Sequence, residues 1–244
     1  MIFYSPNYKS IFVTLQEEEV EFCRDLAEKR CKFKKWGDKA NSKNKEWRKG
    51  VLNDEDDPSC AERIGLYGEE AFSILTGLLV DETVSEKGDK GWDFLLEDKN
   101  KKYKLDVKTS KIVYSKKNNY GEFYIKATND KGTIKTLKSD YYLMASIASH
   151  NGTTINKKGY LSEKDATMIL IELHGFILKK DILKDKDKRL GEPVTSSKKA
   201  HWKNYYIKKE ELIEPIEFLW NYKYLFVFLY NRFYLCPLVI HLIF

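Results

Sequence analysis

Asp93, Asp106 and Lys108 lie near the middle of the chain. Two aspartates and a lysine can catalyse hydrolysis of a phosphodiester bond when their side chains lie close together. Alternation along a β-strand puts Asp106 and Lys108 on the same face, and Asp93 lies in the strand expected before them. Two adjacent carboxylates make a hard-oxygen site suited to Mg²⁺. A neighbouring lysine can hold a phosphate oxygen or orient the attacking water. The pattern therefore indicates metal-assisted hydrolysis of a phosphodiester.

An ordinary solvated strand face also explains the Asp-x-Lys spacing. The chain holds 43 Lys and Arg against 37 Asp and Glu, so such triplets arise without any function, and spacing alone favours this second interpretation. The net charge of +6 suits a polyanionic partner but does not require one.

A change from helical to strand periodicity marks the segment that carries these residues. Residues 92–97 form a short apolar run, and in residues 103–108 Tyr, Leu and Val alternate with Lys, Asp and Lys. The Lys-Asn-Lys turn between the two runs predicts a hairpin. Further strands are predicted over 122–127, 141–148, 168–173 and 205–208, the last at a sheet edge.

Two helices are predicted before the hairpin. The segment Thr14-Leu-Gln-Glu17 fits a capping box and predicts a helix over residues 15–32. A second helix is predicted over residues 61–79 from an apolar stripe at helical spacing. Because Gly65 and Gly68 would weaken an isolated helix, we expect close packing against another element there.

The order of these elements predicts a mixed sheet with helices packed on it. We expect three regions: an N-terminal helical extension over residues 1–60, a core over 61–217 and an apolar tail over 218–244. Lys223, Arg232 and Pro237 interrupt the tail, so a buried helix or a dimer interface is favoured over a membrane span.

Composition places the chain among intracellular globular proteins. Hydrophobic residues make up 42% of the chain and charged residues 33%, which is typical of a folded domain and not of a disordered one. The four cysteines show neither zinc-finger spacing nor the density of a disulfide framework. We therefore expect a reducing, cytoplasmic location.

Three segments in order carry a resemblance to a known family: Gly65-Leu-Tyr-Gly68-Glu69-Glu70-Ala71-Phe72, Gly91-Trp92-Asp93-Phe94 and Leu105-Asp106-Val107-Lys108-Thr109-Ser110. Together they resemble the PD-(D/E)XK nuclease superfamily, also called restriction-endonuclease-like. There, a helix carrying a glutamate precedes a hairpin bearing Asp and then (Asp/Glu)-x-Lys. The match covers about residues 61–110, and Trp92 replaces the proline of the name motif. Asp140-Tyr-Tyr and Gly175-Phe-Ile resemble later strand starts of such proteins.

The resemblance implies an α/β fold of three layers, α-β-α, with a mixed central β-sheet flanked by helices. It implies that Asp93 and Asp106 are metal ligands and that Lys108 is the catalytic lysine. The backbone carbonyl of Val107 would complete the coordination, and a helix glutamate would bind or orient a second metal or its water.

Which helix glutamate does this is left open by periodicity, because Glu69 and Glu70 flank the apolar stripe on opposite sides. The Gly-Glu-x-Ala pattern of similar proteins favours Glu69. Lys111 and Arg63 are weaker candidates for contacts with the DNA backbone. A plain exposed position is the favoured explanation for Lys111 and an equally good one for Arg63.

The expected function is therefore a Mg²⁺-dependent deoxyribonuclease, an endonuclease in the first instance, with Mn²⁺ as a substitute metal. DNA is the expected partner, RNA is less expected, and cuts in both strands of a duplex would favour a homodimer. A membrane partner is not expected. The alternative is a catalytically inactive nuclease-fold module that binds nucleic acid. Fold alone does not choose between them.

Overall fold

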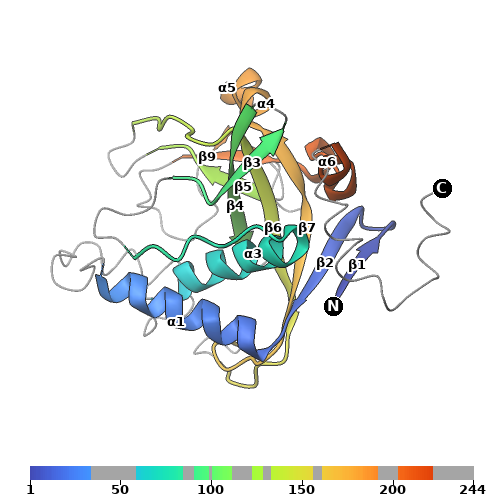
Figure 1. Cartoon of the computed structure of the whole chain (residues 1–244). Coiled ribbons are helices and arrows are strands. Elements are labelled where there is room, and N and C mark those ends of the chain that lie inside the picture. The colour runs from blue at the N-terminus through green and yellow to red at the C-terminus, as the bar shows by residue number, and fades with distance from the viewer. Residues whose placement is uncertain are drawn as a thin grey trace.

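A six-stranded mixed sheet forms the centre of the computed structural model (Figure 1). The structure describes residues 1–33, 59–84, 91–98, 101–111, 123–128, 133–155, 161–191 and 203–221. The strands lie in the order β1 (Ile2–Ser5), β2 (Ser10–Leu15), β7 (Ile169–Leu178), β6 (Tyr141–His150), β4 (Lys101–Ser110) and β3 (Phe94–Asp98). Only the β4–β6 pair is parallel. The predicted mixed α/β sheet is confirmed.

The predicted hairpin is the pair β3–β4. Its antiparallel register runs from Phe94 opposite Leu105 to Asp98 opposite Lys101, and the turn at residues 99–100 lies outside the described residues. On its other side β4 pairs with β6 as far as Ser110. Because β3 pairs with β4 only up to Leu105, the second half of β4 has no strand beside it on the β3 side within the described chain.

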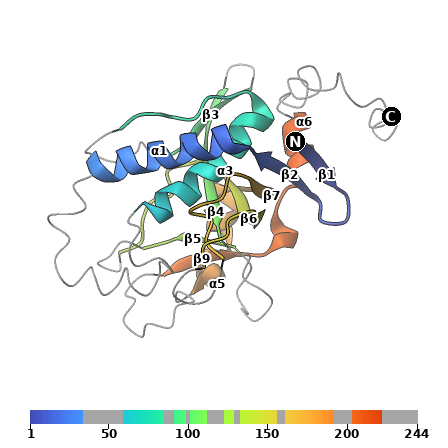
Figure 2. The same ribbon diagram turned by 90° about the horizontal axis from the view of Figure 1, so that it is seen from below.

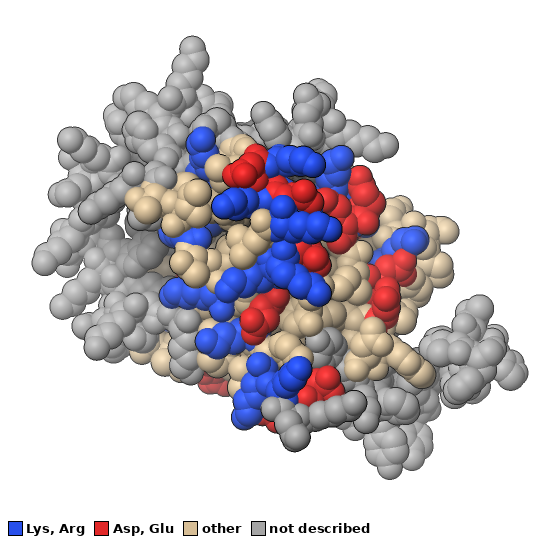
Figure 3. All heavy atoms as spheres, turned by 90° about the horizontal axis from the view of Figure 1, so that it is seen from above, with Lys and Arg blue, Asp and Glu red and all other residues tan. Residues whose placement is uncertain are grey.

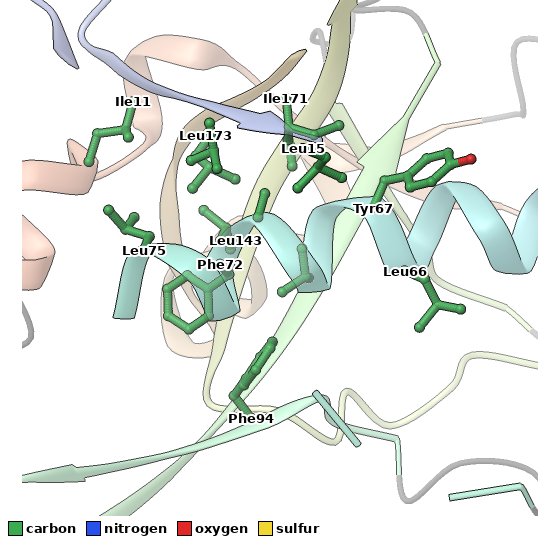
Figure 4. Packing of buried hydrophobic residues seen from close by; sticks show 14 of the residues in the cluster. Ile11, Leu15, Leu66, Tyr67, Phe72, Leu75, Phe94, Leu143, Ile171 and Leu173 are labelled. Atoms are coloured by element: carbon green, nitrogen blue, oxygen red, sulfur yellow. The ribbon is translucent and has the colours of Figure 1, made fainter. Parts of the chain in front are cut away.

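Two helices, α1 (Glu17–Phe33) and α3 (Cys60–Thr76), lie side by side across one face of this sheet (Figure 2). Figure 4 shows how the apolar stripe of α3 enters the core between the two layers. There Phe72 meets Phe94 of β3 with ring centroids 5.0 Å apart and Phe176 of β7 at 6.1 Å. Both helices were predicted, and their positions are confirmed to within a few residues.

The start of α1 differs from the prediction by two residues. Thr14 belongs to β2, and the helix begins at Glu17 with the Gln16 N–H donating to Glu19 Oε2 at 2.7 Å. The two N-terminal strands were not predicted, although β2 pairs with β7 inside the central sheet. Five of the six residues of β2 are buried, so the alternation that reveals a half-exposed strand is missing.

The opposite face of the sheet is covered mainly by a second, three-stranded sheet in the order β5 (Phe123–Lys126), β9 (Asn204–Ile207) and β8 (Leu190–Gly191). Its apolar side chains pack with Tyr142, Met144 and Ile177 of the central sheet and with Ile182 of α4 (Lys179–Lys184). A layer of helices was expected here. In the described residues the short strands β5 and β9 provide most of the cover instead.

Three short elements complete the described chain: α5 (Lys186–Arg189), the 3₁₀ helix η1 (Lys209–Glu211) and α6 (Pro215–Asn221). The beginning of the predicted apolar tail lies in α6, where Phe218 stacks on Phe176 with ring centroids 3.7 Å apart. Residues 222–244 lie outside the described residues. Among the described helices, none combines the length and the apolar composition that crossing a membrane requires.

The prediction that a strand begins at Gly175 is wrong, because Gly175 lies beside a β-bulge inside β7. Tyr141 does begin β6, but Gly175 lies in the middle of β7, where its φ of +149° suits glycine. The register shifts there, because Met144 pairs with Gly175 and Ala145 with Leu173. The extra residue, His174, is buried with its Nε2 2.8 Å from Ser146 Oγ.

At Gly68, α3 packs closely on β4. A Cβ added there would lie 1.9 Å from Thr109 Oγ1 and 3.1 Å from Val107 Cγ1. At Gly65 the nearest atom to an added Cβ is 3.9 Å away, so that position has room. The predicted close packing is confirmed for Gly68 and not for Gly65.

We expect Gly68→Ala to reduce the free energy of unfolding by about 1–3 kcal/mol, because the new methyl group pushes α3 away from β4. The matched variant Gly65→Ala is expected to be neutral or to stabilise by up to about 1 kcal/mol through helix propensity. Urea denaturation followed by circular dichroism measures both. Equal effects of the two substitutions would contradict the packing described for Gly68.

Candidate active site

A cavity of about 310 Å³ lies where β3 stops and leaves the edge of β4 open. Its walls come from the first half of α3, from the residues that lead into β3, from the end of α1 and from Asp81. Its floor is formed by Asp106, Val107, Lys108 and Thr109 of β4. Glu69, Asp93, Asp106 and Lys108 therefore line one cavity.

Beyond the end of β3, the side chain of Asp93 binds the backbone of β4, where a neighbouring strand would otherwise do so. Its own N–H donates to the carbonyl of Leu105 at 2.8 Å, which continues the ladder one residue beyond β3. Its Oδ2 accepts a hydrogen bond of 2.6 Å from the N–H of Val107. This bond satisfies a backbone donor at the open edge and holds the Asp93 carboxylate beside Asp106.

Val107 presents its backbone to the cavity. Its side chain is only 4% exposed and faces the core, yet the residue lines the cavity. The N–H and C=O of one strand residue point to the same side of the strand. Because the Val107 N–H points to Asp93, its carbonyl also points toward the open edge, as the predicted role in metal binding requires.

Asp106 and Lys108 form an ion pair, with Lys108 Nζ 2.5 Å from Asp106 Oδ1. The Asp106 side chain is only 14% exposed, which does not fit the interpretation of an ordinary solvated strand face. Burial lowers the pKa of Lys108, but the carboxylates of Asp106 and Asp93 outweigh it and raise the pKa above its ordinary value. Lys108 therefore carries a positive charge at neutral pH.

Of the two helix glutamates, Glu69 lines the cavity and Glu70 does not. Glu69 is 9% exposed and lies within electrostatic reach of both Asp106 and Lys108. Glu70 lies instead near Glu19 of α1. The tertiary structure thus directs one member of the pair into the cavity, a choice that periodicity left open.

The acidic groups of the cavity are incompletely compensated. Burial raises the pKa of Glu69 to about 7, with the negative charges of Glu62 and Asp106 adding to the rise and Arg30 and Lys108 opposing it. Burial also raises the pKa of Asp93 well above its usual range, together with the charges of Glu69 and Asp106. A proton or a bound cation would relieve this repulsion.

The donor set fits Mg²⁺ in chemical type, because it offers carboxylate oxygens and a backbone carbonyl oxygen. In the described residues, however, no three Asp, Glu, His or Cys side chains already converge as a metal site. Two of the oxygens are occupied, since Asp106 Oδ1 holds Lys108 and Asp93 Oδ2 holds the Val107 N–H. Binding a metal here would require the side chains around these two contacts to rearrange.

The predicted DNA contacts Arg63 and Lys111 lie in a different environment. Arg63 is 4% exposed and pairs with Glu163 at 2.9 Å, and Lys111 Nζ lies 2.8 Å from the other oxygen of the same carboxylate. Neither residue lines the cavity. This buried network joins the start of α3, the end of β4 and the segment that holds Glu163.

Arg30, Glu62 and Asp81 line the cavity but were not predicted. Arg30, in the last turn of α1, pairs with Glu62 Oε1 at 3.1 Å and donates to the carbonyl of Asp81. Their spacing gives no signal, because the three residues come from separate elements that only the packing of α1 on α3 brings together.

Comparisons of the chain with protein-family models, with curated proteins and with solved structures found no match. The geometry of the cavity is therefore the basis on which a function is proposed.

The raised pKa values predict a pH dependence of stability. Glu69 has an ordinary pKa of 4.5 and a pKa of about 7 in the folded protein, so between these values the folded state binds more protons than the unfolded chain. The stabilisation from these protons is complete below the ordinary pKa and is lost as the pH rises through about 7. We therefore expect the free energy of unfolding to fall across this range.

Glu69→Gln is expected to flatten this fall, because the amide does not titrate. Glu97→Gln, at an exposed position of β3, serves as the control and is expected to leave the pH profile unchanged. Urea denaturation across the pH range in the absence of divalent metal measures the profile. A Glu69→Gln profile as steep as that of the wild type would contradict the assignment of the shift to Glu69.

Proposed function

We propose that this protein is a metal-dependent nuclease that hydrolyses phosphodiester bonds of DNA, and that it acts as an endonuclease. The observation that carries the proposal is the meeting of Glu69, Asp93, Asp106 and Lys108 in one cavity at the open edge of β4. Three carboxylates beside one lysine suit phosphodiester hydrolysis, which needs charge stabilisation and a positioned cation.

The restriction-endonuclease-like fold is part of this proposal. In its support, α3 carries Glu69 ahead of an antiparallel hairpin whose second strand pairs in parallel with β6. This order matches the helix and hairpin of the PD-(D/E)XK pattern. The three-stranded sheet on the second face is a departure from a plain three-layer arrangement of helices and sheet.

The cofactor we propose is Mg²⁺, with Mn²⁺ as a substitute. The carboxylates of Asp93, Asp106 and Glu69 and the carbonyl of Val107 would hold it, since all four residues line the cavity. When bound, the metal supplies Lewis-acid stabilisation of charge on the phosphate and a water that is easier to deprotonate.

The chain's own residues have separable tasks. The charged Lys108 ammonium offers donors to a non-bridging phosphate oxygen, where negative charge increases during attack. Glu69 lines the same cavity, and its carboxylate would bind the metal or orient the attacking water. Asp93 holds the edge of β4 in place through the Val107 N–H.

Mg²⁺ is expected to raise the Tm of the wild-type protein at pH 8, above the pKa of about 7 of Glu69, because the cation offsets the repulsion among the acidic side chains of the cavity. The gain is about 3 kcal/mol in the free energy of unfolding when the metal is present at about one hundred times its Kd. Thermal unfolding with and without MgCl₂ measures it. Asp106→Asn should lose most of the gain, and an equal gain in that variant would place the metal elsewhere.

Lys108→Ala is expected to reduce the cleavage rate by about 10²–10³-fold, because the charge on the phosphate loses its partner. Lys102→Ala provides a matched control, since Lys102 lies on the same face of β4 but is exposed and pairs with Glu97. Gel assays with single-stranded, duplex and branched DNA, and with RNA, in MgCl₂ give the rates. The absence of cleavage of every substrate by the folded wild-type protein would refute the proposed function.

A further inference from the structure

The face of β4 that carries Asp106 and Lys108 continues as a row of charged residues away from the cavity. Alternation places Lys104 and then Lys102 on this face, toward the turn of the hairpin. Side chains two residues apart on a strand are spaced by roughly 7 Å. Lys104 is thus the next cation along the strand after the Asp106–Lys108 pair.

Lys104 also lies beside the wall of the cavity. Its Nζ is 6.0 Å from the centroid of the Trp92 ring, and Trp92 lines the cavity. Its backbone is fixed on the other side of the strand, where its N–H donates to Asp140 Oδ2 at 2.9 Å. The Lys104 ammonium is therefore kept near the rim formed by Trp92.

Lys138 reaches the same rim from a different segment. A Cβ added at Gly91, whose φ is +80°, would lie 2.4 Å from Lys138 Cδ and 3.0 Å from its Nζ. The neighbouring Ser139 Oγ donates to the Gly91 carbonyl at 3.1 Å and holds the two segments together. The side chain of Lys138 thus packs on Gly91, and its ammonium lies at the wall that Gly91 and Trp92 build.

Among the described residues, Lys104 and Lys138 pair with no carboxylate, whereas three other lysines of this region do. Lys102 pairs with Glu97, Lys108 with Asp106 and Lys111 with Glu163. Lys104 and Lys138 are both exposed. Figure 3 looks down on the face toward which the β3–β4 hairpin runs, and Lys and Arg side chains gather there in a band with Asp and Glu between and beside them.

We infer that one strand of the nucleic acid leaves the cavity over the Gly91–Trp92 wall, with its phosphates bound by Lys104 and Lys138. The inference rests on the proposed function for the position of the cleaved phosphate at Lys108. A polyanion with regularly spaced charges fits a lysine in the cavity followed by two at its rim, whereas a small anion would meet only one of them. The unpartnered charges favour these contacts over Arg63 and Lys111.

The double variant Lys104→Gln/Lys138→Gln tests this path. Its matched control is Lys164→Gln/Lys208→Gln, which removes two positive charges from exposed residues on segments that line no part of the cavity. Binding of fluorescent single-stranded and duplex DNA oligonucleotides is measured by anisotropy over a series of salt concentrations. EDTA is present throughout, so that cleavage does not interfere.

We expect the rim variant to bind single-stranded DNA about ten-fold more weakly, and the slope of log K against log salt to become shallower by about 1.4 for two lost phosphate contacts. The control variant should match the wild type. A rim variant that also matches the wild type, or a wild type that binds no DNA, would overturn the inference. If the rim variant loses binding but no cleavage is found with Mg²⁺, the path stands and the nuclease proposal fails.

Discussion

The hydrogen bond from the Val107 N–H to the Asp93 carboxylate is the contact on which the rest of the site depends. A strand edge needs a partner for every backbone donor, and a longer β3 would have supplied it. Because a side chain supplies it instead, the sheet edge is satisfied while the space beside Asp106 stays open. The same contact fixes the Asp93 carboxylate next to the Asp106–Lys108 pair.

The site also depends on the position of α3, since Glu69 reaches the cavity only if the helix lies close to β4. Gly68 permits this approach because no side chain separates the helix from Thr109. The buried pairing of Glu163 with Arg63 and Lys111 joins the first turn of α3 to the end of β4. A buried ion pair contributes little net stability, but breaking it leaves an uncompensated charge, so it restricts how the two elements can shift.

Ionisation of the buried carboxylates in the cavity is unfavourable for the folded state. Burial and mutual repulsion raise the pKa values of Glu69 and Asp93, which means that their ionised forms destabilise the folded state. Such perturbed carboxylates collected in one cavity are typical of functional sites, although ion-pair networks also produce them. Here Lys108 and Arg30 compensate only part of the negative charge. A divalent cation would compensate the rest.

The sequence alone determined those features that local pattern encodes. Period-two alternation predicted the hairpin and the shared face of Asp106 and Lys108, and the 3.6-residue stripe predicted α3. It did not reveal β2, which is buried on both faces and lacks alternation. It predicted β5 and β9 as strands but placed β9 at a sheet edge, whereas β9 lies between β5 and β8 in the small sheet that covers the second face. The choice of Glu69 over Glu70, the burial of Arg63, the position of Arg30 in the cavity and the contact of Lys138 with Gly91 were decided by tertiary packing. The physical reason is that each depends on the distance between elements far apart in the chain, which no local periodicity records.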